Sequence, residues 1–199
     1  MGHNIQINYT FVSICIVVIG LFCFYANIER KIIKTRRMIV VAVMTALCIV
    51  GRFVPFFKPI IAFTILTGIY VGSDAAFLVG SLSAFISNFY FGQGPWTPFQ
   101  MMAFGLIGVF SSFISKYIKH NKFLLLSYGF ISGIFFSFIM DIWTVLWYNN
   151  GLNLELYLAA LITAIPYTLS YGISNVIFLS LCGKSFGEKL ERVKKKYGI

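Results

Sequence analysis

The sequence predicts an all-α integral membrane protein, and three observations support this fold class. Apolar residues make up 59% of the chain and charged residues 11%, against roughly 45–50% and 25% in soluble domains. The apolar residues form continuous runs near the length of a spanning helix, about 20 residues, rather than the alternation of a β-barrel. The basic residues lie in short clusters between those runs, as in cytoplasmic loops. The net charge of +10 therefore does not indicate nucleic-acid binding.

Seven apolar runs account for most of the 199 residues. Seven spans need about 140 residues, which excludes a large soluble catalytic or ATP-binding domain and a twelve-span transporter. The expected spans are 9–28, 38–57, 59–72, 75–91, 99–118, 123–147 and 156–182. The third is short, with a rise of only about 18 Å over its twelve central residues. We expect it to be tilted, shielded by neighbours or extended by the segment before it.

The first run could be a cleaved signal peptide, but its flanks favour an uncleaved helix. No Lys or Arg precedes it, and the basic cluster 29–37 comes after it, which reverses the order of a signal peptide. With the N-terminus outside, fourteen of the sixteen Lys and Arg residues face the cytoplasm, and only Arg52 and Lys58 do not. The positive-inside rule therefore predicts an outer N-terminus and a cytoplasmic C-terminus in a multi-pass protein of the cell membrane.

The chain divides into three predicted parts. Residues 1–37 form an N-terminal span with a basic linker, 38–183 form a six-span membrane domain, and 184–199 form a basic tail. Apolar side chains in the tail recur at helical spacing among lysines, which predicts an amphipathic helix on an anionic inner leaflet. A solvated tail is the alternative.

Catalytic and metal-binding chemistry is sparse in the sequence. Four cysteines, Cys15, Cys23, Cys48 and Cys182, lie in or beside apolar runs and are interpreted as packing residues. The stretch 182–185 resembles the end of a phosphate loop, but Phe178 replaces the first glycine of that pattern. We therefore expect no enzyme, no cofactor and no metal site, and any use of ATP would come from a partner.

Asp141 is the one acidic residue inside a predicted span. A charge at membrane depth is expensive and needs a partner, a protein interior or a water-filled cavity. Asp141 is therefore predicted either to contact a ligand or to be a structural hub, for instance paired with Arg52.

The predicted outer ends of the helices concentrate polar and aromatic residues. The loop 91–100 contains fixed turns at glycine and proline, with Gln93, Gln100 and Trp96 between them, and Asn88 lies one turn below. Trp147 and Asn149 end the sixth span. An interfacial aromatic belt explains Trp147 and Tyr148 well and the amides less well. The combination predicts an outward-facing pocket for a planar, polar organic ligand.

Small residues recur at four-residue spacing in three spans. Ala42 and Ala46 form one pair, and 68–72 and 129–133 are GxxxG segments. Such pairs permit close helix approach, and for the glycine pairs the expected role is packing within this chain.

The stretch 51–110 resembles the substrate-binding S components of energy-coupling factor (ECF) vitamin transporters. The resemblance is carried by 66–80, Leu-Thr-Gly-Ile-Tyr-Val-Gly-Ser-Asp-Ala-Ala-Phe-Leu-Val-Gly, and by 91–101, Phe-Gly-Gln-Gly-Pro-Trp-Thr-Pro-Phe-Gln-Met. The Ala42-xxx-Ala46 pair is similar to the family's docking motif. The likeness covers about 38–185 and implies a six-helix S-component core, to which the span 9–28 is an additional helix.

The resemblance implies a high-affinity capture subunit that binds a vitamin or related micronutrient at the outer face. Its partners would be a transmembrane coupling subunit and two cytoplasmic ATPase subunits, with Ala42 and Ala46 facing the coupling subunit. The positions that would bind the ligand are Arg52, Trp96, Gln100, Asp141, Asn149 and Tyr167. The aromatic outer face favours cobalamin or a corrinoid precursor, with riboflavin or another vitamin next. A stand-alone secondary transporter or channel for an organic solute is the alternative, which would need its own coupling route.

Overall fold

The computed structural model of the chain describes residues 35–54, 57–149, 151 and 153–198, together with Cys15, Val18, Ile19 and Phe22. This part of the chain is helical and contains no strand, which confirms the all-α prediction. The helices are α2 (Thr35–Arg52), α3 (Ile60–Tyr70), α4 (Ser73–Phe91), α5 (Thr97–Phe113), α6 (Ser115–Ile118), α7 (Lys122–Asn149) and α8 (Leu154–Tyr197). The predicted span 9–28 lies outside the described residues, apart from the four named above.

A helix occurs in each predicted segment between 38 and 182. Three of these helices, α4, α7 and α8, are long and apolar enough to cross a membrane, and α3 and α5 are shorter apolar helices. The structure thus supports a membrane location. The boundary predicted at 37/38 falls inside α2, and the predicted span 99–118 is divided at Ile114, where the backbone leaves the helical conformation between α5 and α6.

Local sequence explains where several helices begin and end. Gly72 and Gly92 have φ values of +120° and +106°, which residues with a Cβ rarely adopt. Gly72 separates α3 from α4, and Gly92 comes directly after the last residue of α4. Pro98 lies in the first turn of α5, where a missing N–H removes no helical bond. Asn153 caps α8, because its side chain accepts hydrogen bonds from two backbone N–H groups of the first turn.

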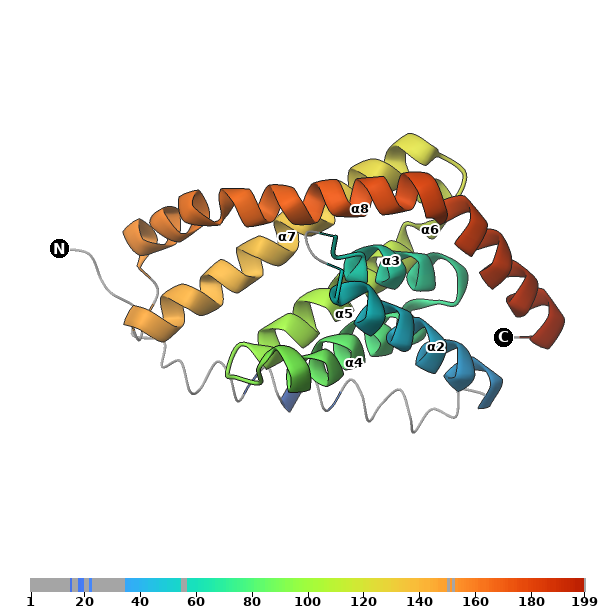
Figure 1. Cartoon of the computed structure of the whole chain (residues 1–199), viewed down its shortest axis with the longest axis horizontal. Helices are drawn as coiled ribbons and strands as arrows, with labels where there is room; N and C mark the ends of the chain where they lie inside the picture. Colours follow the sequence, from blue (N-terminus) through green and yellow to red (C-terminus); the bar gives the residue numbers. More distant parts are fainter. Residues whose placement is uncertain are drawn as a thin grey trace.

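Helix α3 is the centre of the bundle. Ten of its eleven residues are buried, and it packs against α2, α4, α5 and α8. This arrangement confirms that the short third segment is shielded by its neighbours. Helices α7 and α8 pack along each other as a long hairpin across α2–α5, as Figure 1 shows.

The glycine pairs bring helices into close contact inside this chain, as predicted. A Cβ on Gly68 would lie 2.0 Å from Ser111 Oγ and 2.4 Å from the carbonyl oxygen of Gly108, so α3 lies directly against α5. A Cβ on Gly133 would lie 2.8 Å from the backbone nitrogen of Gly172, so α7 meets α8 in the same way.

The tail is helical through Tyr197, in agreement with the predicted amphipathic helix, and α8 continues without a break across the boundary expected at 183/184. Leu190 is part of the buried core, and the ring of Phe186 lies 5.2 Å from that of Phe63. A Cβ on Gly187 would lie 2.4 Å from the hydroxyl of Tyr70, so the absence of a side chain there permits close packing of α8 on α3. The first half of the tail therefore packs on the bundle through its apolar face.

An ion pair fastens the same segment to the end of α6. Lys119 Nζ lies 3.2 Å from Glu191 Oε2, and Lys195 is 3.6 Å from the same carboxylate. The hydrogen bond and charge of Lys119 hold the pKa of Glu191 below its ordinary value. The stabilisation from this contact is present at neutral pH and is lost as the pH falls through that lowered pKa.

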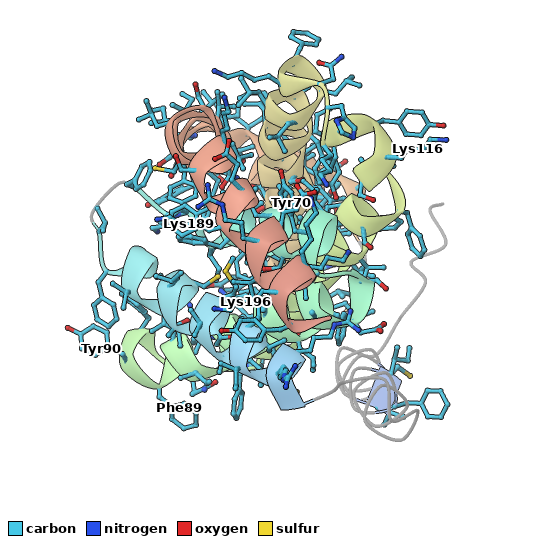
Figure 2. The ribbon with its side chains drawn as sticks, turned by 90° about the vertical axis from the view of Figure 1, so that its right-hand side faces the viewer. Tyr70, Phe89, Tyr90, Lys116, Lys189 and Lys196 are labelled. Carbon is cyan, nitrogen blue, oxygen red and sulfur yellow. The ribbon has the colours of Figure 1, made fainter. Side chains whose placement is uncertain are left out.

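The helix ends separate into two groups. The start of α2, α6 and the end of α8 lie toward the right of Figure 1, whereas the ends of α4 and α7 and the start of α8 lie toward the left. Figure 2 views the right-hand end, where Lys189 and Lys196 project from α8 beside the more central Tyr70, and Lys116 projects on the other side. The basic segments of the described chain are therefore gathered at one end of the molecule.

Candidate functional site

A hydrogen-bonded network joins α2, α4 and α5 near the ends of α2 and α4. Arg52 Nη1 donates to Ser87 Oγ at 2.5 Å and to Asn88 Oδ1 at 2.8 Å. Asn88 Nδ2 donates in turn to Thr97 Oγ1 and Gln100 Oε1, each at 2.9 Å. Asn88 is completely buried, and both ends of its amide are used, so it positions Arg52 and Gln100 relative to each other.

The loop between α4 and α5 is tied to this network. Thr97 Oγ1 donates to Gln93 Oε1 at 3.0 Å, and Gln93 Nε2 donates to the carbonyl oxygen of Phe85 at 2.8 Å. Gly94 lies against the ring of Trp96, where a Cβ would be 2.3 Å from the indole. The loop therefore follows a tight path, as predicted, with Gln93 fixed by hydrogen bonds and Trp96 packed against Gly94.

The guanidinium of Arg52 also has an aromatic neighbour. Its Cζ lies 4.7 Å from the ring centroid of Phe91, at cation–π distance. Phe53 contacts both Phe91 and Tyr90, with ring centroids 5.1 Å and 4.7 Å away. Within the described chain, the guanidinium is thus held by neutral groups alone, with hydrogen bonds at Nη1 and the Phe91 ring near its Cζ.

Three tryptophans from two elements form a second group. Trp96, at the start of α5, lies 5.7 Å from Trp143 of α7 in an edge-to-face arrangement, and Trp143 lies 6.2 Å from Trp147 in a stacked one. The Nε1 of Trp143 is buried and has no hydrogen-bond partner among the described residues. A buried indole donor normally has one, so this group can donate to a ligand or a water molecule.

Asp141 lies just before this tryptophan group on α7. Its side chain is 8% exposed, and its Oδ2 is buried without a partner in the described chain. The pairing with Arg52 that the sequence left open does not occur, because none of the ion pairs between described residues involves Asp141. Ser137, one turn away, accepts a hydrogen bond from Thr168 at 2.6 Å and joins α7 to α8.

The nine residues predicted to bind the substrate therefore fall into distinct places. Arg52, Asn88, Gln93 and Gln100 share one hydrogen-bonded network, and Trp96 and Trp147 share the tryptophan group. Asp141 is buried on α7, and Asn149, at the end of α7, donates to the carbonyl of Gly151 at 3.5 Å. Tyr167 is 70% exposed on α8 and joins neither group.

Five participants were not among the predicted site residues. Ser87 and Thr97 complete the network, and Trp143 connects the other two tryptophans. Lys58 and Tyr171 form a further contact, with Lys58 Nζ 5.3 Å from the Tyr171 ring. Ser87 had a detectable signal, because it lies one helical turn after Ser83 and next to Asn88 inside an apolar run. The contact of Lys58 with α8 joins residues over a hundred positions apart and has no local signal.

The described helices define a helical bundle with apolar segments of membrane-spanning length and a polar, aromatic site built from α2, α4, α5 and α7. Residues 32–188 match DUF6580, a family of unknown function, and the chain belongs to this family. No curated protein and no solved structure matches the chain.

Proposed function

We propose that the protein is the substrate-capture subunit of an ECF-type importer, which binds a vitamin or related micronutrient at one end and delivers it across the membrane with partner subunits. The resemblance of 51–110 to S components supports this function, and so does the grouping of amide, guanidinium and indole groups around the α4–α5 loop. Such a mixture suits a planar ligand with polar edges.

The observation that carries the proposal is an apolar stripe on α2. Ala42 and Ala46 are exposed, and they share their face with Ile39, Val43 and Val50, all more than half exposed. Two small residues one turn apart permit close approach by a helix of another protein. A coupling subunit that docks on this exposed face would not contact the hydrogen bonds between Arg52 and α4.

In this proposal the basic end of Figure 2 faces the cytoplasm, and the α4–α5 loop faces outward. Maleimide added from outside should label a cysteine at Tyr148, which is 78% exposed, but not one at His120, which is exposed at the other end. The unmodified protein, with its native cysteines, gives the background. Labelling of His120→Cys but not of Tyr148→Cys would show that the protein has the opposite orientation in the membrane.

The ligand itself can be found by mass spectrometry of small molecules that remain bound to detergent-purified protein. We expect Gln100→Ala and Asp141→Asn each to weaken binding of the retained molecule by about 1–3 kcal/mol, roughly 5–150-fold, because each loses a polar contact. Trp96→Ala should lose a comparable amount through lost apolar contact. Calorimetry gives the affinities.

Thermal unfolding without ligand distinguishes a binding role from a structural one. Asp141→Asn removes a buried charge that has no described partner, so the unliganded variant should be at least as stable as the wild type. Tyr167→Ala, on the exposed face of α8, is a useful comparison for the site variants. Normal binding by Trp96→Ala, Gln100→Ala and Asp141→Asn, with lower stability for Asp141→Asn, would place the ligand elsewhere and make Asp141 structural.

A further inference from the structure

Lys58 lies beside the middle of α8, and a second cation, Arg52, interacts with the same region. The backbone N–H of Lys58 donates to Ser174 Oγ at 2.8 Å, which ties the α2–α3 connection to α8. Lys58 Nζ lies 5.3 Å from the ring centroid of Tyr171, and Arg52 interacts electrostatically with both Lys58 and Tyr171. Lys58 and Tyr171 are therefore in contact, and Arg52 lies within electrostatic range of both.

No acidic side chain neutralises the two cations within the described residues. The ion pairs there involve Arg37, Lys119 and Lys195, and neither Arg52 nor Lys58 takes part in one. Of the six acidic residues in the chain, all but Glu29 lie in the described part. Two unpaired cations within electrostatic range of each other repel, so the arrangement is destabilised unless an anion joins it.

The depth of the cluster adds to that cost. Tyr171 is 17 residues after the first residue of α8, about 26 Å along the helix. The cluster thus lies beside the middle of the apolar segment 156–182 rather than at its end. Unpaired cations at membrane depth are expensive and mark ligand or ion sites.

The available atoms of the cluster are hydrogen-bond donors. Arg52 uses only Nη1 for Ser87 and Asn88, and its Nε and Nη2 make no hydrogen bond within the described chain. The Tyr171 hydroxyl and the Lys58 ammonium likewise have no hydrogen-bond partner there. A guanidinium edge, an ammonium and a phenol together match the oxygens of a phosphate or carboxylate.

We propose that Arg52, Lys58 and Tyr171 bind an anionic group, a phosphate or a carboxylate, of the molecule that the protein captures. This inference rests on the proposed function, because it specifies the charge of that ligand. The fixed edge of Arg52 orients the remaining guanidinium donors, and Lys58 supplies the second charge.

The same oxygens occur in soluble molecules and in lipid headgroups, and the test has one arm for each source. Full-length protein in neutral detergent is titrated with inorganic phosphate and with citrate at constant ionic strength set by chloride, and the unfolding temperature is measured. A second arm compares nanodiscs of phosphatidylcholine with nanodiscs that also contain phosphatidylglycerol. A saturable stabilisation in either arm gives an apparent Kd and identifies the source.

Lys58→Gln is the main variant, because its side chain makes no hydrogen bond that the fold needs. We expect its apparent Kd to be about tenfold weaker, since it loses a charge-assisted hydrogen bond. Tyr171→Phe should weaken binding about fivefold with the fold retained. Lys116→Gln removes the same charge from an exposed position (Figure 2) and should bind like the wild type.

Equal apparent Kd values for the wild type and Lys58→Gln, or no saturable stabilisation in either arm, would overturn the inference. Because the measurement uses the isolated protein, it does not depend on partner subunits. Anion binding without copurifying partners would support the inference and contradict the proposed function. Copurifying partners without anion binding would support the proposed function and contradict the inference.

Discussion

Gly68→Ala should destabilise the protein by about 1–3 kcal/mol, although alanine favours helices over glycine. The added Cβ would lie 2.4 Å from the carbonyl oxygen of Gly108, which is backbone and cannot rotate away. It would also lie 2.0 Å from Ser111 Oγ, whose hydrogen bond to the carbonyl of Ile65 joins α5 to α3. The two helices must therefore separate. Thermal unfolding in detergent measures the effect.

Gly183→Ala is the matched control on α8. A Cβ there would meet no atom closer than 3.9 Å, so the substitution should be neutral or stabilise by up to about 1 kcal/mol through helix propensity. Equal unfolding temperatures for the two variants would show that α3 and α5 are not in close contact.

Ala42→Trp and Ala46→Trp should each abolish assembly with a coupling subunit while ligand binding by the isolated protein survives. Both alanines are exposed on α2, so an indole there need not disturb the core, but it prevents close approach by another helix. The loss should exceed about tenfold in both the amount of copurified partner and the uptake rate, because helix association depends on packing across the whole stripe.

The same change on α8 controls for the effect of a bulky residue on an exposed helix face. Ala159 is exposed, so Ala159→Trp should leave assembly and uptake intact. Normal uptake by both α2 variants would exclude this stripe as the docking face, whatever the ligand affinity.

Helix positions were predictable because apolar runs and glycine or proline breaks are local. The runs indicated helices in all the described segments, and Gly72 and Gly92 lie at the breaks after α3 and α4. The GxxxG segments were correctly interpreted as packing, because close approach needs small residues wherever the partner lies.

The position of Lys58 beside the middle of α8 was not predictable. Positive-inside reasoning predicted Arg52 and Lys58 outside the cytoplasmic clusters, but it does not say which helix they meet, and the short α3 brings Lys58 beside α8. The packing of the tail on the bundle was not predictable for a similar reason. Its amphipathic pattern requires an apolar surface, and the sequence does not say whether that surface is lipid or the α3 face of the bundle.

The candidate site was predicted in part. Two amides and a tryptophan in one loop suggested that Gln93, Trp96 and Gln100 act together, and they are held around that loop. Asn88 accepts a hydrogen bond from Arg52 and donates to Thr97 and Gln100 because α4 packs between α2 and α5. No local sequence pattern encodes that packing. Tyr167 was selected through the resemblance alone, and its exposed position on α8 separates it from the others.

The capture-subunit proposal is tested most directly by purifying the tagged full-length chain from its native membranes and identifying the copurifying proteins by mass spectrometry. We expect one transmembrane coupling subunit and two ATPase subunits with the wild type, and their loss from Ala46→Trp. Recovery of the chain without ATPases, in a sample where it still binds its small molecule, would contradict the proposal and favour a stand-alone transporter.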